Sequence, residues 1–126
     1  MEKSALIVAG GIGKRLNNHI PKQFIILGDQ PILMHTLRKF SHLDKIYLVL
    51  PKKYFEKWRT LCLKYKFDIK HILVEGGENR FSSVKNGLSA IKYTDIILIH
   101  DGARPFVKKE LITTLINTVS SGFGIV

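Results

Sequence analysis

Cysteine is almost absent from this sequence, since Cys62 is the only one among 126 residues. An internal disulfide and a cysteine-based metal cluster are therefore excluded. Cys62 falls on the apolar stripe of a helix expected over residues 54–65. We interpret it as a core residue and not as a nucleophile.

Long apolar runs are also missing, because none approaches the ~20 residues that a membrane-spanning helix needs. The first residues, MEKSALIVAGG, lack the small-residue cleavage site of a signal peptide. Their apolar run fits a buried first strand better. The sequence predicts a cytoplasmic protein that does not bind a membrane.

Acidic residues are scarce: ten stand against twenty basic ones, which gives a formal net charge of +10. Such a charge favours anionic partners, namely nucleic acid, a membrane surface or phosphorylated small molecules. Much of the excess is interleaved with apolar residues, so a solvated helix face explains it without a ligand. These lysines are Lys52, Lys53, Lys57, Lys64, Lys66 and Lys70.

Apolar segments alternate between the strand and the helix pattern along the chain. Continuous apolar runs predict buried strands at residues 5–9, 46–50, 71–74 and 96–99. Apolar residues at helical spacing predict helices that start near Pro31, span 54–65, follow Asn79 and span about 108–120. The third helix is expected to turn Phe81, Val84, Leu88 and Ile91 inward, and the last one carries Leu111, Leu115 and Val119.

This alternation predicts a Rossmann-like α/β fold, a mainly parallel sheet with helices on both faces. Residues 1–126 form one nucleotide-binding domain in this interpretation. Residues 121–126 (SGFGIV) are typical of a turn that enters a new strand. We therefore expect an incomplete domain, truncated at its C-terminus.

Three polar or glycine-rich segments follow predicted strands, at residues 10–22, 75–83 and 100–105. In an open α/β sheet, ligands bind beyond the carboxyl ends of the strands. The three segments should therefore converge on one side of the sheet. This convergence is the main argument for a binding site.

The first of these segments is suited to phosphate. Its glycines, which lack a Cβ, let backbone N–H groups approach phosphate oxygens, and its cations lie nearby. A P-loop is excluded because Arg15 follows Lys14 where Ser or Thr is required, and a dinucleotide fingerprint is excluded by Leu16. An ordinary tight turn between strand and helix remains the alternative.

The motifs resemble a known family. The segment AGGIGKR at 9–15, followed by PKQ at 21–23, is similar to the signature loop of the sugar-nucleotide pyrophosphorylase superfamily. The segments GGENR at 76–80, with Ser83-Val84 and Gly87-Leu88, and HDGARP at 100–105 resemble 2-C-methyl-D-erythritol 4-phosphate cytidylyltransferases. The match covers the chain from the first strand onward.

The resemblance implies that CMP is transferred from CTP to a polyol phosphate, with release of pyrophosphate and with Mg²⁺ as cofactor. It makes Arg15 and Lys22 the transition-state cations, and it places Asp101 near the substrate phosphates and the metal. It implies a homodimer, in which the second half of the family's fold would grip the alcohol. The nucleotide-binding residues that it implies are Ala9, Gly10, Gly11, Gly13, Lys14, Gly77, Glu78, Arg80, Ser83 and Gly102.

Some of these residues have alternative interpretations. Glu78 and Ser83 could instead be favoured at the start of a helix, and Asp101 could pair with Arg104 to brace its loop. Gly10 and Gly102 depart from the alanine common in the family.

Three other functions stay open. They are a ribitol-5-phosphate cytidylyltransferase, a fragment without activity and a nucleic-acid-binding module. Against the last, no aromatic stacking platform accompanies the basic loop.

Overall fold

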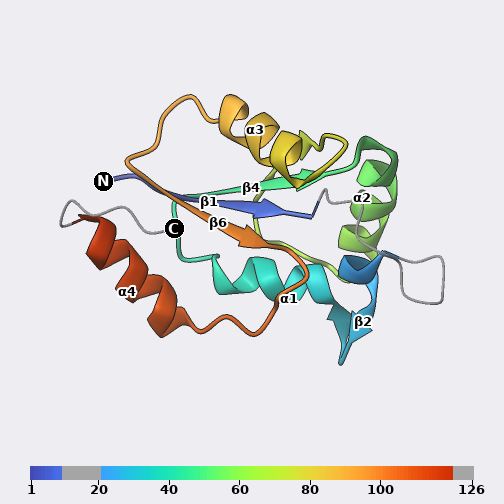
Figure 1. Ribbon diagram of the computed structural model, residues 1–126. Helices are drawn as coiled ribbons and strands as arrows, with labels where there is room; N and C mark the ends of the chain where they lie inside the picture. The colour runs from blue at the N-terminus through green and yellow to red at the C-terminus, as the bar shows by residue number, and fades with distance from the viewer. Residues whose placement is uncertain (10–20, 121–126) are drawn as a thin grey trace.

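The computed structural model describes residues 1–9 and 21–120, which build a four-stranded sheet and a small two-stranded hairpin (Figure 1). The sheet has the order β5-β4-β1-β6, and every neighbouring pair in it is parallel. Its strands are β1 (Lys3–Val8), β4 (Lys45–Leu50), β5 (Ile72–Glu75) and β6 (Ile96–Asp101). The predicted α/β fold is confirmed.

Helices cover both faces of this sheet, as expected from its continuous apolar strands (Figure 1). Ala5 and Ile7 of β1 point into the larger core, where three helices pack: α1 (Ile32–Lys39), α2 (Phe55–Lys64) and α4 (Lys109–Ser120). Leu6 and Val8 point to the opposite face, which α3 (Arg80–Ala90) covers. The alternation of side chains along β1 thus divides the core into two layers.

Short elements connect the first strand to α1. The 3-10 turn η1 (Lys22–Phe24) leads into the hairpin of β2 (Ile26–Leu27) and β3 (Gln30–Pro31). Gly28 turns this hairpin at a φ of 70°, which favours glycine. A second 3-10 turn, η2 (Lys52–Tyr54), precedes α2.

Asn79 caps α3 as predicted, because its side chain accepts a hydrogen bond from the Ser82 backbone N–H (2.8 Å). The predicted inward face of this helix is partly wrong. Phe81 is 78% and Leu88 is 43% exposed, while Val84 and Ile91 pack against the core. The buried face runs through Ser83 and Gly87, whose small size lets the helix lie close to the sheet.

The buried stripe of α4 differs from the predicted one at two of its three positions. Ile112 and Ile116 are buried in place of Leu111 and Leu115, and Leu111 is half exposed, whereas Val119 packs against the core as predicted. The lysines attributed to a solvated surface are exposed as predicted: Lys52, Lys53, Lys57, Lys64, Lys66 and Lys70.

The close approach of α3 to the sheet generates a prediction. A Cβ at Gly87 would lie 2.9 Å from both Leu6 Cδ2 and Val49 Cγ2, two buried side chains. We expect Gly87→Val to lower the free energy of unfolding by about 1–3 kcal/mol, because overpacking must shift the helix. Denaturant unfolding measures this change.

The matched control is Ser89→Val, an exposed position two residues further along the same helix. It imposes the same β-branched residue without the clash. Equal effects of the two variants would contradict the close packing of α3.

Candidate nucleotide-binding site

The carboxyl ends of all four parallel strands lie along one edge of the sheet (Figure 1). Val8, the last residue of β1, is in register with Val49 of β4 and with Asp101 of β6. Leu50 is in register with Glu75, the last residue of β5. Ala9, Gly76 and Gly102 therefore leave the sheet at this edge, and the described parts of the three predicted segments converge there.

The opposite edge is closed by side chains of the protein itself. Asp95 accepts a hydrogen bond from the Glu2 backbone N–H (2.6 Å), and Asp44 accepts one from the Lys3 N–H (2.7 Å). Asp95 also accepts a hydrogen bond from the Tyr93 hydroxyl, and these two bonds hold the pKa of the Asp95 carboxyl below its usual value. The backbone donors at the amino end of β1 are thus already satisfied, which leaves the carboxyl edge for a ligand.

Gly77 is tied to the start of α3 behind β5. Its backbone N–H donates to Ser83 Oγ at 3.1 Å, and Ser83 is fully buried. A Cβ at Gly77 would lie 2.5 Å from Ser82 Cβ and 3.0 Å from the Ser82 carbonyl carbon, so only glycine fits. Glu78 and Arg80, by contrast, are exposed at this end of the helix.

Asp101 shapes the turn that follows β6. Its Oδ1 accepts a hydrogen bond from the Ala103 N–H (2.9 Å), and its Oδ2 lies 3.7 Å from Arg104 Nε. The expected ion pair with Arg104 is confirmed. Asp101 is only partly buried, so its carboxylate is still open to solvent on this edge.

His100 supports the same turn. Its Nε2 donates to the Arg104 carbonyl oxygen (2.9 Å), and its ring lies against Phe40 with 5.1 Å between centroids. These contacts give His100 a structural role.

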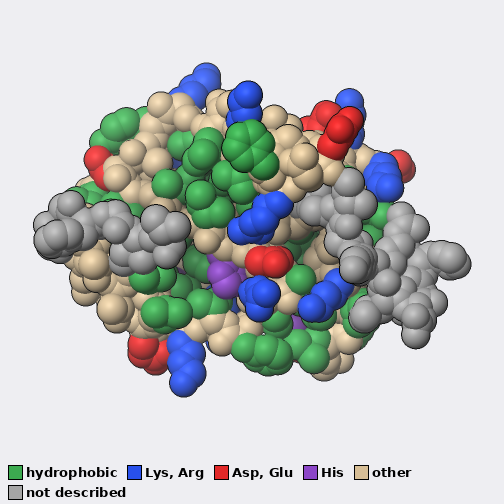
Figure 2. All heavy atoms as spheres, in the orientation of Figure 1, with side chains coloured by type: hydrophobic (Ala, Val, Ile, Leu, Met, Phe, Trp, Pro, Cys, Tyr) green, Lys and Arg blue, Asp and Glu red, His purple; other side chains and the backbone are tan. Residues whose placement is uncertain are grey.

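Basic and acidic side chains lie next to each other on the face shown in Figure 2, and a group of apolar side chains lies over α3. Phe81 and Leu88 are exposed apolar side chains of α3. An apolar patch over α3 therefore borders the charged surface (Figure 2).

Thr36 of α1 was not recognised in the sequence, although it fixes the position of Gly102. It is fully buried, and its Oγ1 donates to the Gly102 carbonyl oxygen at 2.7 Å. A Cβ at Gly102 would lie 2.9 Å from Leu33 Cδ1 and 3.0 Å from Ala9 Cβ. Gly102 is therefore held against the end of β1. A threonine on an apolar helix face was the only available signal.

Gln23 belongs to the PKQ segment of the family motif, but the sequence assigned it no role. It is buried, and its Nε2 donates to the Ala9 carbonyl oxygen at 3.0 Å. This bond ties η1 to the end of β1 across the intervening chain. The neighbouring Lys22 is exposed, so the predicted catalytic cation emerges beside the strand end.

Five of the predicted site residues lie outside the described residues: Gly10, Gly11, Gly13, Lys14 and Arg15. Of the others, Ala9, Lys22, Gly77, Ser83, Asp101 and Gly102 are placed at or directly behind the carboxyl edge by the contacts above.

A metal ion at this edge would depend on its ligand for most of its coordination. Within residues 1–9 and 21–120, no cluster of three or more His, Cys, Asp or Glu side chains could hold a metal. Asp101, at the end of β6, supplies a partly exposed carboxylate there. That fits Mg²⁺, which is commonly held by one or two carboxylates together with phosphate oxygens and waters.

Cys62 does not contribute to chemistry. It is free and half-buried, and burial raises the pKa of its thiol to about 11. The thiolate that would act as a nucleophile is therefore disfavoured at neutral pH.

The parallel sheet and the glycine-containing turns at one edge define the class as an α/β nucleotidyltransferase fold. A model of the family of 2-C-methyl-D-erythritol 4-phosphate cytidylyltransferases matches residues 4–125. The chain belongs to this family.

Individual relatives agree with this assignment. The chain is 50% identical over 115 residues to the 2-C-methyl-D-erythritol 4-phosphate cytidylyltransferase of Bacteroides fragilis, covering 89% of this chain and 52% of the relative. It is 47% identical over 112 residues to that of Porphyromonas gingivalis, covering 88% and 50%. The chain thus spans about half the length of the curated relatives it matches.

Solved structures show the same fold. The 4-diphosphocytidyl-2C-methyl-D-erythritol synthase from Anaerococcus prevotii matches with a TM-score of 0.77 at 30% identity, over 94% of this chain and 51% of that one. The cytidylyltransferase from Francisella tularensis matches with a TM-score of 0.74 at 33% identity, over 97% and 54%.

The hydrogen bond of Thr36 leads to a prediction for the loop after β6. We expect Thr36→Val to lower the free energy of unfolding by about 1–3 kcal/mol, since it leaves the buried Gly102 carbonyl without its partner. Thr36→Ser should recover most of the loss because it keeps the hydroxyl.

Thr114→Val is the control, since the hydroxyl of Thr114 also donates to a backbone carbonyl, that of Glu110 in its own helix, but on an exposed face. Thermal or denaturant unfolding compares the three variants. A Thr36→Val protein as stable as the Thr114→Val protein would contradict the role of this bond.

Proposed function

We propose that the protein to which this chain belongs is a cytidylyltransferase, which transfers CMP from CTP to 2-C-methyl-D-erythritol 4-phosphate. The observation that carries the proposal is the meeting of the segments after β1, β5 and β6 at one edge of the sheet. Membership of the family supports the choice of substrates. The product would enter isoprenoid precursor biosynthesis by the non-mevalonate route.

The reaction is a substitution at phosphorus. A phosphate oxygen of the alcohol phosphate forms a bond to the α-phosphorus of CTP, and the bond from this phosphorus to the oxygen bridging to the β-phosphate breaks. The products are the CDP-alcohol and pyrophosphate. Negative charge grows on the leaving pyrophosphate and around the α-phosphorus, so fixed cations and accurate positioning would provide most of the catalysis.

Lys22 and Arg15 are the proposed cations. Lys22 is exposed beside the end of β1, and the bond from Gln23 to the Ala9 carbonyl oxygen holds its backbone there. A lysine that emerges from an anchored turn loses less conformational freedom on binding than one in a free loop. Arg15 and Lys14 are assigned from the family motif alone.

Recognition of the nucleotide is assigned to small and backbone groups. Ala9 and Gly102 meet at the end of β1, and Gly77 has no room for a side chain. Backbone groups at such positions can hydrogen-bond the exocyclic amine and ring nitrogen that distinguish cytosine from uracil. Ser83 would act by fixing Gly77, while Glu78 and Arg80 would face the ribose and the phosphates.

Asp101 is the proposed contact to Mg²⁺, which would neutralise triphosphate charge when bound. A homodimer is proposed from the family resemblance, and the cytoplasmic location predicted from the sequence stays a proposal. Among the described residues, none of the helices has the length and apolarity to cross a bilayer.

Lys22 provides the first functional prediction. In the full-length protein, Lys22→Ala should lower kcat by about 10²–10³ while the affinity for CTP changes much less, because the cation acts on charge that develops in the transition state. Steady-state release of pyrophosphate and CTP titration measure the two effects separately.

Lys92→Ala is the control, because Lys92 is exposed and precedes β6 at the opposite edge of the sheet. Normal turnover in the Lys22→Ala protein would remove Lys22 from the mechanism.

The alcohol can be tested directly. We expect the full-length protein to release pyrophosphate from CTP with 2-C-methyl-D-erythritol 4-phosphate and to be far less active with ribitol 5-phosphate. The segment Arg80, Ser83-Val84 and Gly87-Leu88 favours the former. Higher kcat/KM with ribitol 5-phosphate would assign the protein to the alternative reaction instead.

A further inference from the structure

The turn that carries Lys22 is anchored in the core by an aromatic stack. Phe24, the last residue of η1, is buried and lies parallel to Trp58 of α2, with 6.2 Å between centroids and 12° between planes. Tyr54 meets the same phenyl ring edge-on at 5.5 Å. The position of Trp58 therefore helps to fix η1, in which Lys22 lies two residues before Phe24.

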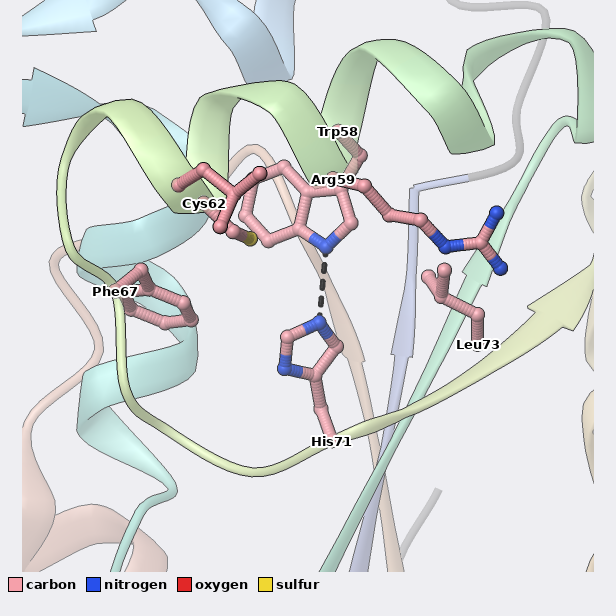
Figure 3. Close-up of a pocket in the computed structure, with 7 residues that line it drawn as sticks. Trp58, Arg59, Cys62, Phe67, His71 and Leu73 are labelled. Carbon is pink, nitrogen blue, oxygen red and sulfur yellow. Dashed lines mark hydrogen bonds between the residues drawn. The ribbon is translucent and has the colours of Figure 1, made fainter.

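Trp58 is in turn held by His71 (Figure 3). The indole Nε1–H donates to His71 Nε2 at 2.9 Å, and His71 Nδ1 lies 2.8 Å from the Ile69 carbonyl oxygen. An indole nitrogen only donates and a carbonyl oxygen only accepts. Both bonds therefore form only when the imidazole is neutral, with its proton on Nδ1.

The surroundings favour this neutral form. Burial lowers the pKa of His71 below its ordinary value of 6.5. An open cavity of about 660 Å³ lies beside the pair, and its lining includes Arg59 and Cys62 from α2 and the ring of Phe67. The described lining contains the cation Arg59 and a thiol whose pKa is raised, but no carboxylate that would stabilise an imidazolium. Asp68 and Lys70, on the segment of His71 itself, are exposed.

We propose that neutral His71 is a positioning residue for Lys22, acting through Trp58 and Phe24, and that protonation of His71 releases this arrangement. A proton on Nε2 would face the indole N–H, so the bond between the two rings would be lost. Trp58 is fully buried, and its N–H would then have no acceptor among its described partners. The cavity beside it gives the imidazolium room to turn toward solvent.

The hydrogen bond between His71 and Trp58 can be tested without an activity assay. Nitrogen NMR of the His71 ring in the full-length protein should show Nε2 unprotonated and Nδ1 protonated at neutral pH. The Trp58 indole N–H signal, identified with a Trp58→Phe variant, should shift as the pH falls, with a midpoint below 6.5. A His71 ring protonated on Nε2 at neutral pH, or a Trp58 signal that ignores the His71 titration, would overturn it.

Protonation of His71 should also affect the stability of the fold. The unfolded chain binds a proton on His71 near pH 6.5, whereas the folded protein binds it only at lower pH, because burial lowers this pKa. The free energy of unfolding should therefore fall as the pH drops from 6.5 toward the pKa of the folded state. In His71→Gln this component should disappear.

The catalytic part rests on the proposed function. His71→Phe removes the acceptor and should lower kcat of the full-length protein about tenfold to a hundredfold with little change in KM for CTP, since Lys22 is misplaced. His71→Gln offers an oxygen that accepts from Trp58 and does not titrate. It should keep turnover near the wild-type value at neutral pH and lack the decline in turnover that we expect of the wild-type protein as the pH falls below 6.5.

The control is His42→Gln, which changes an exposed histidine of the turn after α1. If His71→Phe turns over normally while Lys22→Ala does not, the positioning role is overturned and the proposed function stands. If the wild-type protein has no cytidylyltransferase activity, the proposed function fails, and the NMR titration still decides whether His71 holds Trp58.

Discussion

The parallel pairing of β1 with both β4 and β6 is the constraint on which the site depends. Because Val8 is in register with Val49 and with Asp101, the chain leaves three neighbouring strands at the same edge. β5 extends this edge on the other side of β4. Parallel strands require crossover connections, so each strand end is followed by a segment free to contact a ligand. Reversal of a single strand would send one of these segments to the edge that Asp44 and Asp95 close.

Most of the architecture could be predicted from the sequence because the two central strands, β1 and β4, are buried on both faces and all four strands contain runs of apolar residues. Residues 46–50 form a continuous apolar run, which predicts a buried strand, and Asn79 correctly predicted the start of α3. The inward face of α3 could not be predicted in the same way. Phe81, Val84, Leu88 and Ile91 follow one another at spacings of three and four, so periodicity alone assigns all four to one buried stripe. The sheet instead contacts the side of the helix that carries Ser83 and Gly87, where small residues allow close packing, and Phe81 and Leu88 are left exposed.

The sequence predicted which segments form the site, but not which hydrogen bonds hold those segments in place. Glycines and cations after strand ends point to phosphate whatever the details of packing. The bonds that fix those segments join residues far apart in the sequence, such as Thr36 with Gly102 and Gln23 with Ala9. The helical stripe likewise predicted that Trp58 is buried, but not that its N–H needs His71 as an acceptor. Partners of this kind become visible only after the chain is folded.

The central claim is that the segments after β1, β5 and β6 enclose one nucleotide. The most direct measurement is an amide NMR titration of the full-length protein with CTP and Mg²⁺. We predict that the signals of Ala9, Gly77 and Gly102 shift together with a single dissociation constant, while those of Glu2 and Lys3 at the opposite edge do not move. Shifts confined to one of the three segments, or located at the opposite edge, would contradict it.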